Sequence, residues 1–466
     1  MDAREVAAAW QLPYLDLDDI SDQEIILHKL PQNLIEQHQV LLLSDNRLAI
    51  VDFKNPEMLQ EVAFYLENSP ILTIVDHDKL LSKIAALLHH QERENLLHDE
   101  ASIVKYVEKL FSDAVNKKAS DIHLETDINN LRIRFRIDGI LYEIARLSKN
   151  LAPRIITHLK VMAQLDITEK RLPQDGKLRI TISNHSPIDC RISTCPGIIE
   201  EKIVLRLLNI NTQPLDINML GFSEKNKTLF FSHLQKPQGM ILVTGPTGSG
   251  KTVTLYTALH ILNNPKINIL SAEDPVEITL PGINQVQVNH KIDLTFSAIL
   301  RAFLRQDPDI IMIGEMRDKE TADIAIKASQ TGHLVLSTLH TNSAAETLSR
   351  LINMGIPVYD IAASLTLIIA QRLVRVLCQH CKIQDHLSKS YRAEGCSKCE
   401  NGYLGRTGIY EFLPITTQLS EIILQHPDAI TLEKQARING MQTLYEHGLE
   451  KIGLGITSLS ELSRVT

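Results

Sequence analysis

The 466-residue sequence has few residues of several kinds, and each shortage excludes a class of protein. Six cysteines in a chain of this length are too few for a disulfide-rich scaffold. No apolar run approaches the ~18 residues that span a bilayer, because Ser364 and Thr366 interrupt the most apolar window, 361–370. The N-terminus has Asp2 and Glu5 and no apolar core of a secretory signal, so we expect a cytoplasmic protein.

Basic residues are also scarce relative to acidic ones. The chain has 48 Lys and Arg against 56 Asp and Glu, a net charge of −8. A nucleic-acid helicase needs a basic channel, which this balance does not suggest, so we predict no nucleic-acid partner. The hydrophobic content of 44% and charged content of 22% are typical of a globular protein, and the length predicts two to four domains.

Composition and periodicity divide the chain into five segments. The polar run 89–100 and the Asn, Pro and Asp-containing run 209–220 are the expected linkers. The predicted segments are a small N-terminal α/β or α+β module at 1–95, a second domain at 96–208 that opens with an amphipathic helix, a core at 221–375, a cysteine-containing element at 376–410 and a helical region at 411–466.

In the core, apolar strands alternate with helices. The expected strands are 240–244, 267–272, 309–314 and 333–338, and the expected helices are 251–262, 296–305, 319–330 and 343–353. This alternation predicts βαβ units around a largely parallel sheet, which places the chain in the α/β class.

A phosphate-binding loop follows the first of these strands. Its eight residues match the pattern G-x-x-x-x-G-K-[ST]: Gly245, Pro246, Thr247, Gly248, Ser249, Gly250, Lys251 and Thr252. Glycines allow backbone N–H groups to point at phosphates, and the helix N-terminus adds its positive dipole end. Lys251 is predicted to reach the β- and γ-phosphates and the Thr252 hydroxyl to bind Mg²⁺. A glycine-rich turn without ligand is the alternative, but the flanking strand and helix favour a nucleoside triphosphate site.

Carboxylates and histidines follow the other strands. Glu315 follows the 309–314 strand, where it can supply a Mg²⁺-associated carboxylate or the base that orients the attacking water. The alternative is an ordinary surface carboxylate. Three carboxylates lie within five residues, at Glu273, Asp274 and Glu277, and their negative charges repel one another. A bound cation, a basic partner or solvation in an exposed loop would each relieve this repulsion. His333 and His340 flank the last strand. Either can be a structural histidine, or His340 can sense the γ-phosphate.

These motifs together resemble the secretion ATPases of the type II secretion and type IV pilus assembly family. The resemblance rests on the phosphate loop, Ala-Glu-Asp-Pro-Val-Glu at 272–277, Gly-Glu-Met-Arg-Asp at 314–318 and Thr-Leu-His-Thr-Asn at 338–342, in the family's order. It implies a P-loop (RecA-like) ATP hydrolase acting as a homo-hexamer on the cytoplasmic face of the inner membrane. By the same resemblance Glu315 is the catalytic carboxylate, Glu273 lies near Mg²⁺ and water, and His333 and His340 are His-box residues.

The second segment resembles the PAS-like domain that precedes the motor core in this family. The matching stretches are 119–125, 136–139, 171–176 and 189–193. The resemblance implies that Arg191 and Arg206 approach the phosphates, although each could also be a surface strand arginine. The family's Gly-Glu is replaced by Glu200-Glu201, and a positive φ at Glu200 would cost backbone strain.

Four of the six cysteines form two C-x-x-C pairs, Cys378 with Cys381 and Cys396 with Cys399. Four thiolates are the ligand set of a closed, structural Zn²⁺ site, with a redox dithiol or an empty site as the alternative. Cys190 and Cys195 are isolated, and we expect core or strand thiols there.

The chain ends favour one branch of the family. The tail 455–466 resembles the type II secretion members, and the stretch 11–17 resembles the module that binds their inner-membrane recruiter (GspL-like). Retraction ATPases lack the four cysteines. We therefore expect a type II secretion motor that couples ATP hydrolysis to pseudopilus assembly and protein export, together with a polytopic platform protein (GspF/PilC-like). The alternatives are a type IV pilus extension ATPase and an ATP-binding scaffold without turnover.

Overall fold

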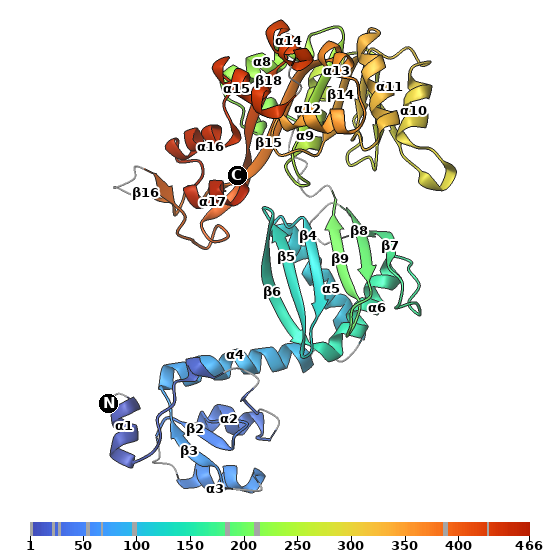
Figure 1. The fold of residues 1–466 in the computed structure, drawn as a ribbon. Helices are drawn as coiled ribbons and strands as arrows, with labels where there is room; N and C mark the ends of the chain where they lie inside the picture. Colours follow the sequence, from blue (N-terminus) through green and yellow to red (C-terminus); the bar gives the residue numbers. More distant parts are fainter. Residues whose placement is uncertain are drawn as a thin grey trace. The chain divides into compact units, whose positions relative to one another are not determined.

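A computed structural model describes residues 3–20, 24–26, 29–52, 56–66, 69–95, 100–181, 187–208, 215–384, 390–425 and 428–466 (Figure 1). The chain divides into two compact units, one formed by 1–136 with 141–207 and the other by 137–140 with 208–466. Part of the predicted linker at 209–220, residues 209–214, lies outside the described residues.

The first unit begins with a small α/β module. Its sheet contains β1 (Leu41–Leu42), β2 (Arg47–Ile50) and β3 (Ile71–Ile74), in which β2 and β3 are parallel. The helices are α1 (Ala3–Trp10), α2 (Gln32–His38), α3 (Pro56–Tyr65) and α4 (His77–Asn95). α4 includes 89–95, so the first part of the expected linker at 89–100 is helical, and 96–99 lie outside the described residues.

The second part of this unit is a six-stranded sheet with two helices. The strands lie in the order β6 (Ile140–Ser148), β5 (Asn130–Ile137), β4 (Asp121–Thr126), β9 (Lys202–Leu207), β8 (Ile188–Cys195) and β7 (Gln174–Ile180), accompanied by α5 (Glu100–Asn116) and α6 (Ala152–Met162). Alternation along β5 buries Ile133 and Phe135, while Arg132 and Arg134 on the opposite face pair with Glu125. Strand β5 therefore has one apolar face and one charged face.

A seven-stranded sheet forms the second unit. Its order is β12 (Asn284–Gln287), β11 (Ile269–Glu273), β13 (Ile310–Ile313), β14 (Leu334–Leu339), β10 (Gly239–Thr244), β15 (Leu365–Leu377) and β18 (Tyr403–Pro414). Neighbouring strands are parallel except β15 and β18, which are antiparallel. The predicted parallel sheet is confirmed, but it continues past residue 375 because β18 pairs with β15 after the cysteine-containing element.

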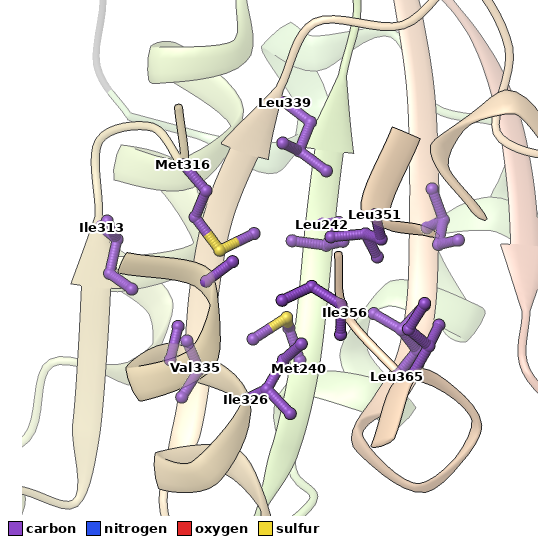
Figure 2. Packing of buried hydrophobic residues seen from close by; sticks show 14 of the residues in the cluster. Met240, Leu242, Ile313, Met316, Ile326, Val335, Leu339, Leu351, Ile356 and Leu365 are labelled. Atoms are coloured by element: carbon purple, nitrogen blue, oxygen red, sulfur yellow. The ribbon is translucent and has the colours of Figure 1, made fainter. Parts of the chain in front are cut away.

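Helices cover both faces of this sheet, which explains why its strands are apolar throughout. On one face α10 (Phe296–Phe303), α11 (Lys319–Gln330), α12 (Glu346–Asn353) and α13 (Val358–Ser364) pack on Met240, Leu242, Ile313 and Val335 (Figure 2). On the other face α8 (Glu224–Leu234) and α9 (Lys251–Leu262) pack on Ile241 and Val243. Burial on both sides fixes β10 and the loop that leaves it.

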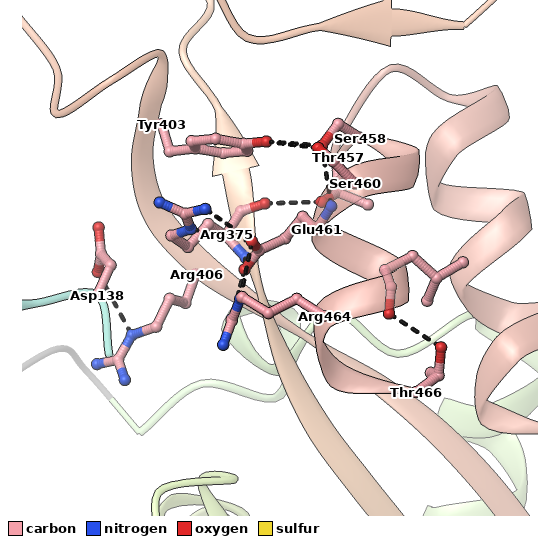
Figure 3. A network of polar contacts seen from close by, with 11 residues as sticks. Asp138, Arg375, Tyr403, Arg406, Thr457, Ser458, Ser460, Glu461, Arg464 and Thr466 are labelled. Atoms are coloured by element: carbon pink, nitrogen blue, oxygen red, sulfur yellow. Dashed lines mark hydrogen bonds and ion pairs between the residues drawn. The ribbon is translucent and has the colours of Figure 1, made fainter. Parts of the chain in front are cut away.

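The C-terminal helices belong to this core. α14 (Thr417–Gln425) and α15 (Ala429–Ile438) contribute Leu419 and Leu432 to the first apolar cluster, and α16 (Leu444–Gly453) and α17 (Leu459–Val465) pack on the outer halves of β15 and β18. Figure 3 shows the polar contact that holds α17: the buried Glu461 accepts hydrogen bonds from Arg375 Nη2 at 2.8 Å and Arg464 Nε at 3.0 Å. The Arg375 guanidinium also lies 4.0 Å from the centre of the Tyr403 ring.

Candidate functional site

The phosphate loop lies at the carboxyl end of β10 and leads directly into α9, as predicted. Gly245, Gly248 and Gly250 have φ values of 147°, 80° and 88°, a region that favours glycine. A Cβ at Gly245 would also lie 2.5 Å from the backbone oxygen of Gln371, so the loop requires glycine there. The sequence pattern and the required backbone geometry therefore agree.

Lys251 begins α9 and folds back over the loop. Its Nζ donates hydrogen bonds to the backbone oxygens of Gly245, at 2.7 Å, and Pro246, at 3.1 Å. Burial lowers the pKa of Lys251 to about 8, with an opposing effect from Glu315 and a further lowering by Arg372. Thr252, in the first turn of the same helix, is exposed. The loop thus presents a buried ammonium group and an accessible hydroxyl, the groups that phosphate and Mg²⁺ require.

Glu315 and His340 lie together near this lysine, although β14 separates β13 from β10. Glu315 is 16% exposed, forms an ion pair with Arg317, and has an oxygen 3.5 Å from His340 Nε2. Burial and the Lys251 charge lower the pKa of His340 despite Glu315. A neutral imidazole and a carboxylate beside the phosphate loop are suited to orienting water and detecting a terminal phosphate.

The loop that contains His340 is joined to the start of the phosphate loop. Thr244, the last residue of β10, has its Oγ1 2.6 Å from Thr341 Oγ1, and it accepts a hydrogen bond from Thr341 N at 2.9 Å. Thr341 Oγ1 also lies 3.0 Å from Thr347 Oγ1 on α12. These hydrogen bonds connect the loop that contains His340 to the end of the strand that supports the nucleotide loop.

Glu273 lies deeper than the sequence suggested. It is 3% exposed and accepts hydrogen bonds from Tyr256, from Ser271 Oγ at 2.7 Å and from Gln285 Nε2 at 3.0 Å. Burial of Tyr256 and its bond to Glu273 raise the tyrosine pKa. With three donors on its oxygens, Glu273 holds β11 against α9 and β12. Its neighbour Asp274 is the more exposed of the two carboxylates and lies near Arg317.

His333 is not at this site. It precedes β14, at the opposite end of that strand from His340, and its Nδ1 lies 2.9 Å from the backbone oxygen of Ala328. This backbone contact is the one expected of a structural histidine, whereas the assignment of His333 as a His-box residue stays a prediction. Its spacing of seven residues from His340 spans the whole strand.

Arg191 and Arg206 lie in the first unit, on β8 and β9, where they are cross-strand neighbours. Arg206 Nε donates to Asp121 Oδ1 at 3.0 Å. Their approach to phosphate stays a prediction. Glu200 does not have a positive φ, since it is not one of the described non-glycine residues in that region. The backbone strain expected there does not arise.

Two residues of β15 that lie outside the sequence motifs also contact the phosphate loop. Gln371, 1% exposed, donates from Nε2 to Ser249 O at 2.6 Å and accepts from Thr254 Oγ1 at 2.8 Å. Arg372 follows it. The available signal was the polar pair Gln371 and Arg372 after the apolar run 367–370. Only the pairing of Ala370 on β15 with Thr244 on β10 shows that this pair lies opposite the phosphate loop.

The four cysteine sulfurs converge at the outer ends of β15 and β18. All lie within 4.8 Å of one another, with separations of 3.9 Å for Cys378 and Cys396 and 3.6 Å for Cys381 and Cys399. Four sulfurs at ~2.3 Å from a tetrahedral zinc are about 3.8 Å apart, so the cluster fits that ion. Cys190 is a buried strand thiol whose pKa burial raises to about 12, and Cys195 is exposed.

Across the described residues, we find no helix with the length and apolar character needed to cross a bilayer.

Comparisons with known proteins identify the family of the chain. The family described as Type II/IV secretion system protein matches residues 96–464, and the MshEN domain matches residues 10–94. The chain is 44% identical to the type IV pilus assembly ATPase PilB of Pseudomonas aeruginosa, over 99% of this chain and 89% of that protein. It is 46% identical to the type II secretion system ATPase E of Vibrio cholerae, over 80% of this chain and 78% of that protein.

Solved structures share the fold. The Legionella pneumophila ATPase DotB superposes with a TM-score of 0.60 at 22% identity and covers 77% of this chain and 95% of its own. The pilus retraction motor PilT with bound ADP gives a TM-score of 0.53 at 26% identity, over 77% of this chain and 96% of its own. With the phosphate loop, Glu315 and His340 assembled on this fold, the chain belongs to the type II/IV secretion system protein family and is an ATP hydrolase.

Proposed function

We propose that this chain is the motor that powers assembly of a type IV pilus. The observation that carries the proposal is how far the similarity extends. The relatives named type IV pilus assembly ATPases match 97–99% of the chain, including the N-terminal module. Those named type II secretion proteins match 79–84% of it.

Type II secretion, the function that the chain ends favour, is the second candidate. Within the part that they match, the secretion relatives are 44–47% identical to this chain, as similar as the pilus relatives at 41–44%. The motor chemistry is the same in either system, so the choice depends on what the N-terminal module binds.

In either system the nucleotide site would work through the residues already described. Lys251 would neutralise the β- and γ-phosphates, Thr252 would bind Mg²⁺, and Glu315 would orient the attacking water, with His340 reporting the terminal phosphate. Arg191 and Arg206 would add positive charge from the PAS-like domain. Because a guanidinium stays charged and forks across two oxygens, it suits that role.

The assembly and location are part of the same proposal. We expect a homo-hexamer at the cytoplasmic face of the inner membrane, with a recruiter bound to the N-terminal module and a platform protein moved by the motor domains. No nucleic acid is expected, because the net charge is −8. The relatives named a type IV pilus assembly ATPase and a type II secretion system ATPase support a role in one of these two systems.

Substitution Lys251→Ala in the source organism tests the function. We expect loss of surface pili with retention of protein export, because the buried lysine is the principal cation of the phosphate loop. Electron microscopy of the cell surface and assay of exported proteins are the measurements. Lys266→Ala, at an exposed lysine beyond α9, is the matched control and should leave pili unchanged. Loss of export with intact pili would favour the secretion motor, and loss of neither would refute the motor itself.

We also propose that the cysteine cluster binds one structural Zn²⁺. Its four donors leave no open position, so the ion would join the ends of β15 and β18. Elemental analysis should give one zinc per chain, and chelation or Cys396→Ser should remove the zinc and lower the melting temperature. Cys195→Ser, at an exposed thiol outside the cluster, should do neither. Zinc-free protein with unchanged melting would contradict the assignment.

A further inference from the structure

An arginine without a carboxylate partner lies beside the phosphate loop. Arg372 is on β15, two residues after Ala370, which is paired in register with Thr244 at the end of β10. An ideal Cβ built on Gly245 would lie 3.2 Å from Arg372 Nη1, so the guanidinium lies against the first residue of the loop.

The partners of this guanidinium are all neutral. Its Nη1 donates to Gln371 O at 3.2 Å, and its Nη2 donates to Asn342 O and Asn342 Oδ1, both at 3.2 Å. No carboxylate among the described residues lies within 4.0 Å of it. Glu346 and Glu411 act on it only through longer-range attraction. A half-buried cation with neutral partners only is an incomplete site, because buried charges are normally paired.

Two other arginines of this unit show the contrast. Arg375, three residues further along the same strand, pairs with the buried Glu461 at 2.8 Å, and Arg317 pairs with Glu315. Arg372 also has a cationic neighbour, because its positive charge lowers the pKa of the Lys251 ammonium group. Two positive groups close to one glycine-rich loop repel each other unless an anion lies between or beside them.

We propose that Arg372 is a phosphate-contact residue, supplied by the motor core itself, for the terminal phosphate of the bound nucleotide. The proposal rests on the proposed function, since it deepens the assignment of the same site. Arg372 lies against the first residue of the phosphate loop and donates hydrogen bonds to Asn342, two residues after His340. The terminal phosphate is therefore the one within its reach, and a planar fork with unused N–H donors can bind two of its oxygens.

The test is nucleotide selectivity of the purified full-length chain. Arg372→Gln should weaken binding of Mg-ATP about 10-fold to 100-fold, the usual effect of losing a hydrogen bond to a charged group, and should weaken Mg-ADP binding far less. Isothermal titration with both nucleotides gives the ratio of the two affinities. Arg372→Lys, which keeps the charge but not the fork, should fall between. Arg437→Gln, at an exposed arginine of α15, is the control and should leave the ratio unchanged.

The outcomes separate this inference from the function on which it rests. An unchanged ATP-to-ADP ratio in Arg372→Gln, with binding lost in Lys251→Ala, overturns the role of Arg372 alone. Undiminished nucleotide binding in Lys251→Ala overturns the site itself. If Arg372→Gln melts at a lower temperature without nucleotide, the affinities of Arg372→Lys decide between a structural role and a phosphate contact. An equal loss of ATP and ADP affinity in Arg372→Lys would show a structural role and refute the phosphate contact.

Discussion

Substitution Glu315→Gln is expected to lower the turnover number for ATP hydrolysis about 10²-fold to 10⁴-fold, the usual contribution of a group that activates or orients a nucleophile. ATP affinity should change little, because the amide keeps the size of the side chain and Lys251 still binds the phosphates. The geometry supports this expectation: Glu315 lies at the end of β13 with an oxygen 3.5 Å from His340 Nε2, close enough to Lys251 to raise the lysine pKa. Steady-state phosphate release and nucleotide titration are the measurements.

The matched control is Glu320→Gln. Glu320 lies five residues later, in the first turn of α11, where it is exposed and pairs with Arg301. Its substitution should leave turnover unchanged. Equal turnover in Glu315→Gln and the unaltered chain would show that another group orients the water. Binding of ATP without measurable hydrolysis by the unaltered chain would favour a scaffold.

Substitution Glu461→Gln is expected to lower the free energy of unfolding by about 3–5 kcal/mol, the usual cost of removing one partner of a buried ion pair. Arg375, whose side chain is 13% exposed, would then remain charged without the carboxylate that now pairs with it. The loss should be large because Glu461 joins α17 to β15 (Figure 3), and β15 also carries the loop contacts of Gln371. Urea denaturation followed by circular dichroism is the measurement.

The same pair predicts a pH dependence. Burial alone would raise the pKa of Glu461, but hydrogen bonds from Arg464 and Arg375 outweigh it and lower the pKa to about 2. An unfolded Glu titrates near ~4.3, so the pair contributes about 3 kcal/mol that is fully present above that pH. This contribution is lost as the pH falls from about 4.3 toward 2, and it should be missing in Glu461→Gln.

Glu450→Gln is the control for both measurements. Glu450 is an exposed residue of α16, the helix that precedes α17, and the substitution removes the same charge from the surface. Its unfolding free energy should stay within about 0.5 kcal/mol of the unaltered chain. A loss in Glu461→Gln no larger than in this control would mean that the ion pair does not stabilise the fold.

The local pattern of the sequence predicted much of the motor core. The expected helices 251–262 and 319–330 coincide with α9 and α11, because a helix is formed by residues close together in the chain. The phosphate loop was predictable for the same reason: eight consecutive residues carry its glycines, its lysine and its hydroxyl. Glu315 and His340 could be placed at one edge of the sheet because the carboxyl ends of parallel strands meet there.

The sequence by itself therefore determined the parallel α/β core, the nucleotide loop and the four-cysteine set, since each depends on residues close together in the chain. Tertiary structure alone decided that β18 returns to pair with β15, that Glu273 is enclosed by three donors, that His333 contacts the end of α11, and that Arg372 lies against Gly245. These facts depend on strand order and on register between segments distant in sequence. Such strand pairing depends on how the apolar faces of distant segments pack together, and no short stretch of the sequence specifies it.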